Sequence, residues 1–205
     1  MLSVRGLSNR LLQPATFRVG AGECVAVQGP SGAGKSVLLR AIADLDPATG
    51  DLRLDGTSRE AMAAPDWRRR VTYLAAESGW WADRVADHFA DTAAAVPLAE
   101  ALGLPAAALD WPVSRLSTGE RQRLALVRAL VQQPRVLLLD EPTGALDGDA
   151  TRRVEGLLRD AMARGTGVLI VTHAPDQADR LAGRRLRVEA GRVREEWAGG
   201  RLTCR

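Results

Sequence analysis

Short apolar or alternating runs recur along the chain, and segments with helical spacing of apolar residues follow most of them. These runs predict strands at residues 2–7, 15–19, 24–28, 52–54, 71–75, 136–139, 167–172, 184–189 and 192–196. Helices are predicted from residue 35 onward, in a long segment that stops at Pro134, and over 149–164 and 175–182. Because strands alternate with helices, we expect an α/β fold with N-terminal antiparallel strands and a mainly parallel sheet covered on both faces.

A different pattern follows the strand predicted at 71–75. An alanine-rich stretch that reaches about Pro105 carries Val85, Phe89 and Val96 at helical intervals, which predicts a small helical insertion. Two roles are open for the tryptophans in or beside this stretch, burial in the insertion or a docking surface for another protein. They are Trp80, Trp81 and Trp111. We expect a single domain over 1–205, with a core at about 1–76 and 134–205 and a helical subdomain at about 77–133.

Composition narrows the class of protein. At 205 residues and 46% hydrophobic content the chain can bury one substantial core. Apolar stretches stay well short of the roughly 20 residues that cross a bilayer, and residues 1–20 do not resemble a secretion signal, so we expect a soluble, cytoplasmic chain. The net charge of +3 comes from interspersed charges, and no nucleic-acid partner is expected. Cys24 and Cys204 are expected to be free thiols.

The first motif with a chemical meaning follows the strand at 24–28 directly and leads into a helix. Its residues are Gly29, Pro30, Ser31, Gly32, Ala33, Gly34, Lys35 and Ser36. This spacing is typical of a phosphate-binding loop, in which backbone N–H groups surround phosphates, the lysine reaches the terminal ones and the hydroxyl holds magnesium. Lys35 is the only lysine among 28 basic residues, all others being arginine. A slim ammonium fits such a loop, whereas a planar guanidinium does not.

Two adjacent carboxylates, Asp140 and Glu141, end the apolar strand at 136–139. With a phosphate loop upstream, Asp140 is expected to hold magnesium and Glu141 to polarise a water that attacks the γ-phosphate. The other interpretation is a pair of exposed turn residues before Pro142. The phosphate loop favours the catalytic one.

The segment Leu116 to Arg123 starts a helix, and Ser117 with the following amides forms a helix start that suits an anion. It also fits a simple Ser-x-x-Glu capping box formed by Ser117 and Glu120. His173 ends the strand predicted at 167–172, and a histidine there is either structural or catalytic.

Taken together, these motifs resemble the ATP-binding subunit of ATP-binding cassette (ABC) transporters, and the resemblance spans nearly the whole chain. The segment from Asp140 to Asp147, Asp-Glu-Pro-Thr-Gly-Ala-Leu-Asp, supports it. The family segment Leu-Ser-Gly-Gly-Gln differs here at Thr118 and Glu120, while Ser117 and Gly119 are retained. The resemblance implies a P-loop NTPase core and a stand-alone bacterial nucleotide-binding domain with ATP and Mg²⁺ as cofactors.

The resemblance also implies roles for residues and partners. Two cassettes, two copies of this chain or one copy and a related cassette, sandwich two ATP molecules. The residues implied to act across that boundary are Ser117, Thr118, Gly119, Glu120 and Asp147. Glu141, His173 and Lys35 are implied to be catalytic, with His173 contacting the γ-phosphate. The cassette powers an integral membrane permease from the cytoplasmic face of the inner membrane. The alternative is a soluble ABC-type ATPase in nucleic-acid or ribosome-linked work, which generally has two cassettes or long coiled-coil insertions.

Two positions depart from the family pattern. Where the family has a glutamine that binds magnesium and contacts the membrane subunit, this chain has Ala76 followed by Glu77. Glu77 is therefore expected either to bind magnesium together with Ser36 and Asp140, or only to contact the membrane partner. No aromatic residue precedes Phe17, so Arg10 is the candidate for stacking on the base.

Overall fold

Six strands form the main sheet of the computed structural model, which describes residues 1–197. Their order is β10 (Arg192–Trp197), β9 (Arg184–Glu189), β3 (Cys24–Gln28), β8 (Gly167–Val171), β7 (Val136–Asp140) and β6 (Val71–Leu74). All neighbours are parallel except β10, which pairs antiparallel with β9. The predicted strands and the mainly parallel sheet are thereby confirmed. Parallel strands run in the same direction, so the carboxyl ends of β3, β7 and β8 all lie at one edge of the sheet.

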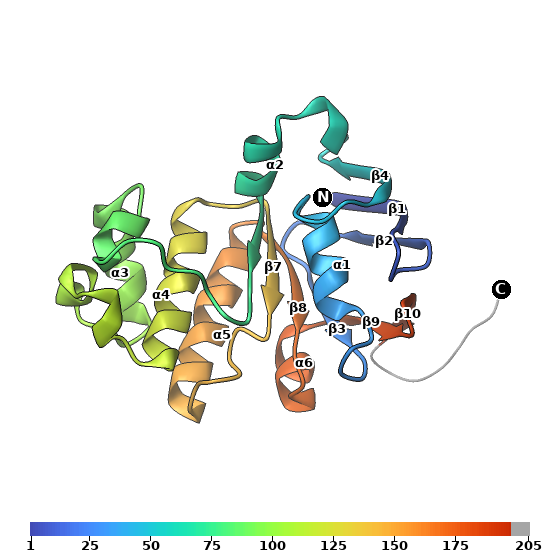
Figure 1. Ribbon diagram of the computed structural model, residues 1–205. Coiled ribbons are helices and arrows are strands. Elements are labelled where there is room, and N and C mark those ends of the chain that lie inside the picture. Colours follow the sequence, from blue (N-terminus) through green and yellow to red (C-terminus); the bar gives the residue numbers. More distant parts are fainter. Residues whose placement is uncertain (198–205) are drawn as a thin grey trace.

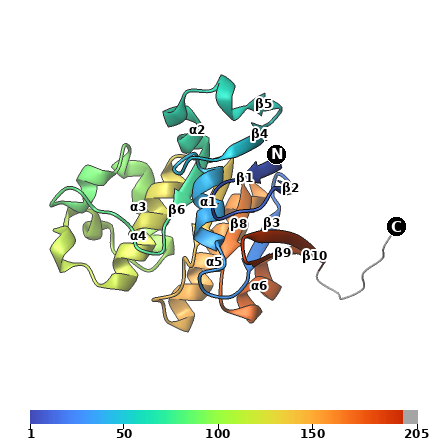
Figure 2. The same cartoon turned by 45° about the vertical axis from the view of Figure 1, so that its right-hand side comes forward.

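A second, antiparallel sheet contains the N-terminal strands. Its order is β2 (Ala15–Val19), β1 (Leu2–Ser8), β4 (Thr49–Leu54) and β5 (Thr57–Ser58). Helix α1 (Lys35–Ile42) packs in the same hydrophobic cluster as both sheets. It is joined there by α2 (Ala64–Arg70), a helix that the sequence analysis did not predict; the Nε1 of its Trp67 donates to the Ile42 carbonyl at 2.9 Å. Figure 2 shows α1 between the small sheet and the main one.

The main sheet buries apolar side chains on both faces, and their alternation explains the fully apolar strands. Val25 and Val27 of β3 belong to the cluster with α1, whereas Ala26 belongs to the cluster on the opposite face. In β7, Leu138 faces α1 and Leu137 faces the other way. Each buried Val or Leu side chain contributes about 1.5–3 kcal/mol. A strand that is buried on both faces has no polar alternation, as is typical of parallel sheets.

Three helices cover the face opposite α1. They are α4 (Thr118–Val131), α5 (Gly148–Ala163) and α6 (Pro175–Leu181), and residues of all three belong to one cluster with the sheet. Glu155 of α5, whose side chain is 2% exposed, binds the Arg180 guanidinium of α6 through both carboxylate oxygens. Hydrogen bonds from Arg180 lower the pKa of Glu155, so the pair stays ionised at neutral pH. It fixes α6 against α5.

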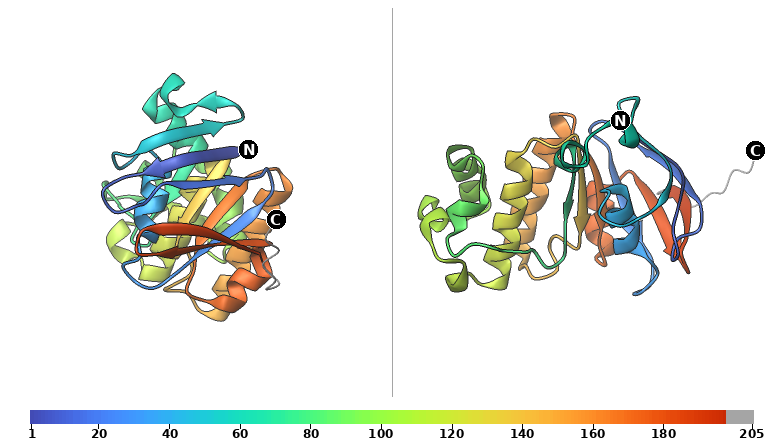
Figure 3. Two further views of the ribbon diagram at one scale, coloured as in Figure 1. Left: turned by 90° about the vertical axis from the view of Figure 1, so that its right-hand side faces the viewer. Right: turned by 45° about the horizontal axis from the view of Figure 1, so that its top comes forward.

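Residues 77–117 form a helical segment to one side, separated from α1 and the small sheet by α4 and α5 (Figures 1 and 3). The segment contains α3 (Thr92–Ala101) and three short 3₁₀ turns at Val85–His88, Ala106–Asp110 and Val113–Arg115. The helical interval predicted from residue 85 onward is broken because Asp91 caps a new helix, its carboxylate accepting from the Ala94 N–H at 2.9 Å.

The three tryptophans differ in burial, and the docking role stays a prediction. Trp80 and Trp111 are partly buried and pack against the core cluster, whereas Trp81 is 72% exposed. The Arg128 guanidinium lies 4.9 Å from the ring centroids of both Trp80 and Trp81. His88 orients this loop because its Nε2 accepts from the Trp81 N–H at 2.9 Å.

Within residues 1–197 no helix combines the length and the apolar character that a bilayer span requires. Cys24 is a buried free thiol, and burial raises its pKa to about 12, so it is unreactive at neutral pH. Cys204 and the predicted end of the core beyond residue 197 lie outside the described residues.

Candidate nucleotide-binding site

The glycine-rich loop connects β3 to α1 at the carboxyl edge of the main sheet. Gly29 has a φ of 149°, and a Cβ there would lie 2.0 Å from the Val188 carbonyl oxygen of β9, so only glycine fits. Gly34, with a φ of 105°, is the N-cap of α1. The helix therefore begins at Lys35, and its free N–H groups face the loop, which favours an anion.

Lys35 is only 7% exposed, although it is charged. Its Nζ donates to the carbonyl oxygens of Gly29 and Pro30, each at 2.9 Å. Among residues 1–197, the ammonium is thus held inside the loop by two neutral acceptors and by no carboxylate. An anionic phosphate is a stronger partner for it than a carbonyl group.

A pocket of about 390 Å³ opens at this loop and contains two further predicted residues. Glu141 and His173 line it together with Ser31 to Val37, and the His173 Nε2 lies 3.2 Å from Glu141 Oε1. Glu141 follows β7, and His173 lies two residues beyond β8. The sheet thus brings together three motifs that are far apart in the sequence.

The backbone of Glu141 adopts an unusual conformation. Its φ is 48°, in the left-handed region, which costs a residue with a side chain on the order of 1–3 kcal/mol. Its N–H donates to the Val171 carbonyl at 3.0 Å, and its own carbonyl accepts from the Gly144 N–H at 3.2 Å. These bonds turn the chain sharply after the strand and direct the carboxylate toward the pocket.

The pocket also includes residues that the sequence analysis did not predict. Leu11, 67% exposed, and the β9–β10 turn at Ala190 and Gly191 complete its lining. The Gly191 N–H donates to the Ala33 carbonyl at 3.2 Å, which fixes the hairpin against the glycine-rich loop. Arg10, the candidate for the base, is exposed and is not among the described lining residues. Leu11, and not Arg10, therefore lines the pocket in this part of the chain.

Asp140 is 4% exposed at the end of β7. Its Oδ2 accepts from the Tyr73 hydroxyl of β6 at 3.0 Å. Burial, and then the Asp140 charge, raise the pKa of Tyr73, so the hydroxyl remains protonated and keeps donating. No cluster of three or more His, Cys, Asp or Glu side chains that could hold a metal occurs within residues 1–197.

Glu77 is exposed in the loop after β6, is not among the described residues that line the pocket, and forms no hydrogen bond or ion pair with the described residues. The contact of Glu77 with magnesium therefore stays a prediction.

The serine-led helix start lies outside the pocket. Ser117 is the N-cap of α4 and forms a capping box, with Glu120 Oε2 accepting from the Ser117 N–H at 2.8 Å and from its hydroxyl at 2.7 Å. These hydrogen bonds lower the pKa of Glu120. Asp147 caps α5 by accepting from the Ala150 N–H at 2.8 Å. None of the five residues expected to act across a boundary is among the described residues that line the pocket; these five are Ser117, Thr118, Gly119, Glu120 and Asp147.

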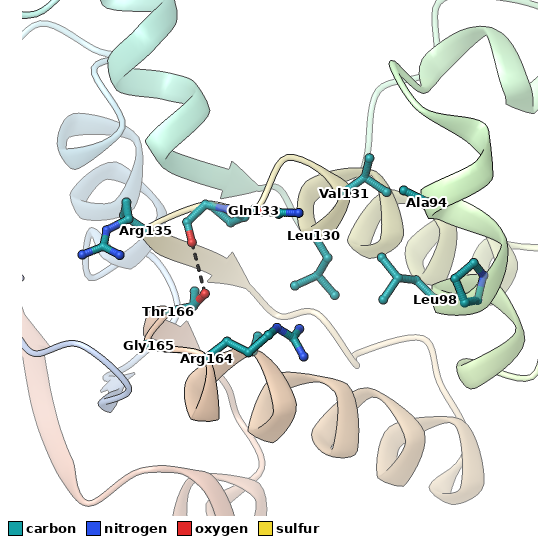
Figure 4. A pocket seen from close by; sticks show the side chains of 12 residues that line it. Ala94, Leu98, Leu130, Val131, Gln133, Arg135, Arg164, Gly165 and Thr166 are labelled. Carbon is teal, nitrogen blue, oxygen red and sulfur yellow. Dashed lines mark hydrogen bonds between the residues drawn. The ribbon is translucent and has the colours of Figure 1, made fainter.

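A second hollow, of about 560 Å³, lies between α3 and the C-terminal ends of α4 and α5 (Figure 4). Leu98 and Leu130 contribute apolar lining, and Arg164 contributes charge. The Thr166 hydroxyl at its edge donates to the Pro134 carbonyl at 3.1 Å. This hollow contains none of the predicted site residues.

Comparison with known proteins identifies relatives of this chain. A family model described as ABC transporter matches residues 12–144. The aliphatic sulfonates import ATP-binding protein SsuB 2 of Nocardia farcinica is 42% identical over 199 residues, which cover 92% of this chain and 78% of that protein. The corresponding SsuB protein of Albidiferax ferrireducens is 38% identical over 206 residues, covering 94% and 70%.

Among solved structures, one described as an ATP-binding subunit of an ABC transporter superposes with a TM-score of 0.88 at 25% identity. The match covers 97% of this chain and 90% of the other. The chain therefore belongs to the ABC transporter family. It is an ATP-binding subunit of that family and an ATPase, as the sequence motifs predicted.

Proposed function

We propose that this chain hydrolyses Mg²⁺-ATP in a sandwich with a second cassette and thereby drives an integral membrane permease, from the cytoplasmic face of the inner membrane. One observation carries the proposal. The pocket joins the glycine-rich loop, Glu141 and His173 but leaves out the helix start at Ser117. One copy thus supplies a phosphate site and a base, while a second anion-binding element faces elsewhere.

The residues of the site have different roles in the proposed ATP hydrolysis. Lys35 and the amides at the start of α1 bind the phosphates. Glu141 Oε1 takes the proton of the attacking water, and His173 Nε2, 3.2 Å away, orients the same water and the γ-phosphate. Leu11 offers an apolar surface beside the loop for the base or ribose.

The oxygen atoms of Ser36, in the first turn of α1, and of Asp140, at the end of β7, are ligands that suit magnesium. Mg²⁺ favours a few oxygen ligands combined with phosphates and water. We assign the protein ligands to the Ser36 hydroxyl and to Asp140, which Tyr73 holds in place. When bound, the ion neutralises phosphate charge. Glu77 remains the additional candidate ligand from the sequence.

The proposed sandwich accounts for the position of the predicted boundary residues. A head-to-tail arrangement of two cassettes would present Ser117 and Gly119 of one to the phosphates bound by the other. Asp147 lies in the same stretch of chain as Glu141 and would contact the partner beside it. The partner cassette is either a second copy of this chain or a related one. ATP would favour the closed state because ADP lacks the γ-phosphate that both cassettes contact.

The permease supplies the transported substrate's binding site in this proposal. The relatives reported above are named as import proteins for aliphatic sulfonates, and an importing permease is the one we would look for first. Trp81, exposed and fixed by Arg128 and His88, is the side chain we propose to contact it.

Co-purification tests the permease assignment. The tagged chain, produced in its native host, is extracted in mild detergent and isolated. We expect a protein with several membrane-spanning helices to co-purify and to raise the ATPase rate of the chain. Trp81→Ala should reduce co-purification while leaving the ATPase rate of the isolated chain unchanged. Recovery with ribosomes or RNA, and without a membrane protein, would favour the soluble ABC-type ATPase instead.

Magnesium titration tests the metal ligands. Asp140→Asn should raise the Mg²⁺ concentration for half-maximal turnover by about tenfold or more, because a charged oxygen ligand becomes a neutral one. If Glu77 also binds the ion, Glu77→Gln should shift the same midpoint upward. An unchanged midpoint in Glu77→Gln would limit Glu77 to contacts with the permease. An unchanged midpoint in Asp140→Asn would contradict the assignment of Asp140.

A further inference from the structure

Gln122, in the second turn of α4, is a polar residue that is only 6% exposed. Both ends of its amide contact the chain segment that follows β7. Its Nε2 donates to the Glu141 carbonyl oxygen at 2.8 Å, and its Oε1 accepts from the Ala145 N–H at 3.4 Å. A buried amide is costly unless its hydrogen bonds are satisfied, and here one segment satisfies both ends.

The contact matters because Glu141 is held in an unfavourable backbone conformation, with a φ of 48°. Its N–H is fixed by β8 through the Val171 carbonyl. Its carbonyl group is fixed by Gly144 within the same turn and by Gln122 from α4. Gln122 is thus the side chain from another element that holds the peptide group following the base.

The same helix carries Ser117 at its start. Between Ser117 and Gln122, the backbone of Gly119 approaches the segment after Glu141 closely, since a Cβ on Gly119 would lie 3.2 Å from the Leu146 side chain and 3.4 Å from the Ala145 carbonyl oxygen. The start of α4 and the turn that carries the base are therefore packed as a unit. A shift of one requires a shift of the other.

We propose that Gln122 is a positioning residue that sets the orientation of Glu141 and couples it to the start of α4. The inference rests on the proposed function, because the start of α4 senses a nucleotide only when a second cassette presents one. When that start engages a phosphate, Gln122 transmits the movement to the Glu141 carbonyl and brings the carboxylate into line with the attacking water. Gln122 itself touches no nucleotide.

Two substitutions in the full-length protein separate its two hydrogen bonds. Gln122→Met fills a similar volume and removes both bonds, while Gln122→Glu keeps an acceptor for Ala145 but cannot donate to Glu141 when ionised. The matched control is Gln132→Met, which changes an exposed glutamine just beyond the other end of α4. Each protein is assayed for kcat, for KM of ATP, for Tm and for ATP-dependent dimer formation.

We expect kcat to fall by about 10- to 100-fold in both Gln122 variants, because a small misplacement of a reacting group costs that much. KM should stay within about twofold of the unsubstituted protein, and ATP-dependent dimer formation should be no weaker, because the glycine-rich loop and the Ser117 cap are unchanged. Mere loss of structure does not produce this split. Gln132→Met should match the unsubstituted protein in all four measurements.

Three results would overturn the inference. Gln122 has no positioning role if kcat is unchanged in both variants, and its role is only structural if kcat falls in proportion to a loss of Tm and of dimer formation. If Gln122→Glu keeps full activity, the bond to Glu141 is dispensable. A separate result would bear on the proposed function. If the unsubstituted protein hydrolysed ATP without forming a dimer, the proposed sandwich would be refuted, and so would the coupling between the start of α4 and Glu141. The measurement of kcat would still test whether Gln122 orients Glu141.

Discussion

Glu141→Gln is expected to reduce ATP turnover about 100- to 10,000-fold, the range that a positioned general base contributes. The amide is nearly the same size as the carboxylate, so the turn after β7 should persist. So should the backbone hydrogen bonds at this position, in which the N–H donates to the Val171 carbonyl and the carbonyl accepts from Gln122. What is lost is the group beside His173 Nε2 that takes the proton of the attacking water. Phosphate release measured at saturating ATP and Mg²⁺ checks this directly.

The same variant should accumulate as an ATP-bound dimer. Lys35 and the start of α1 still bind ATP, and without hydrolysis the contacts across the proposed sandwich are not removed. Light scattering with size-exclusion chromatography should show a dimer with ATP and a monomer with ADP. Glu100→Gln, which changes an exposed glutamate of α3, is the matched control and should keep normal turnover. A Glu141→Gln protein that stays monomeric with ATP in every condition, including with its membrane partner, would contradict the sandwich.

The sequence predicted the residues at the carboxyl edge of the main sheet because each motif there is a short run of neighbouring residues. A loop of fixed spacing between a strand and a helix predicts its own geometry, and the structure places Lys35 inside that loop. Apolar runs that end in Asp140 and before His173 are buried strands in a parallel sheet, so their ends had to lie near the loop. The pocket that joins Lys35, Glu141 and His173 follows from these few local facts.

Contacts between distant side chains were not predictable in this way. Tyr73 reaches Asp140 across two adjacent strands, and Gln122 reaches Glu141 from a helix on one face of the sheet. Both contacts depend on which face each element presents to its neighbour and on the register between the elements. The spacing of apolar residues does not determine that register to within one residue. Gln122 carried one signal, because Ala125 and Leu126 lie one helical turn further on, but its neighbours Arg121 and Arg123 also suit an exposed face.

The sequence also failed to predict where the helices in residues 77–117 begin and end. Apolar spacing predicted continuity from residue 85 onward, whereas a local cap at Asp91 starts a new helix. A side-chain cap acts on only a few residues, whereas the apolar spacing of a helix is detected over a much longer window of sequence. A search for apolar spacing therefore misses a cap inside that window. The helix α2 was missed because its seven residues include Pro65 and three arginines, which hide the single buried Trp67.

Replacing Lys35 separates the charge of this side chain from its shape. Lys35→Arg keeps the positive charge, but the site is 7% exposed and holds the ammonium between two carbonyl oxygens, Gly29 and Pro30, at 2.9 Å. A planar guanidinium does not fit this space without moving the loop. We expect ATP affinity to fall about 10- to 150-fold in both Lys35→Arg and Lys35→Ala, the equivalent of one charged hydrogen bond.

Turnover in both variants should fall further, by about 100-fold or more, because a fixed donor to the transferring phosphoryl group is lost as well. Isothermal titration with ATP and a phosphate-release assay measure the two effects separately. Arg40→Lys, a charge-preserving change at an exposed position of the same helix, is the control and should leave both unchanged. If Lys35→Arg bound and hydrolysed ATP normally, positive charge alone would suffice at this position. The occurrence of one lysine among 27 arginines would then carry no information about the nucleotide.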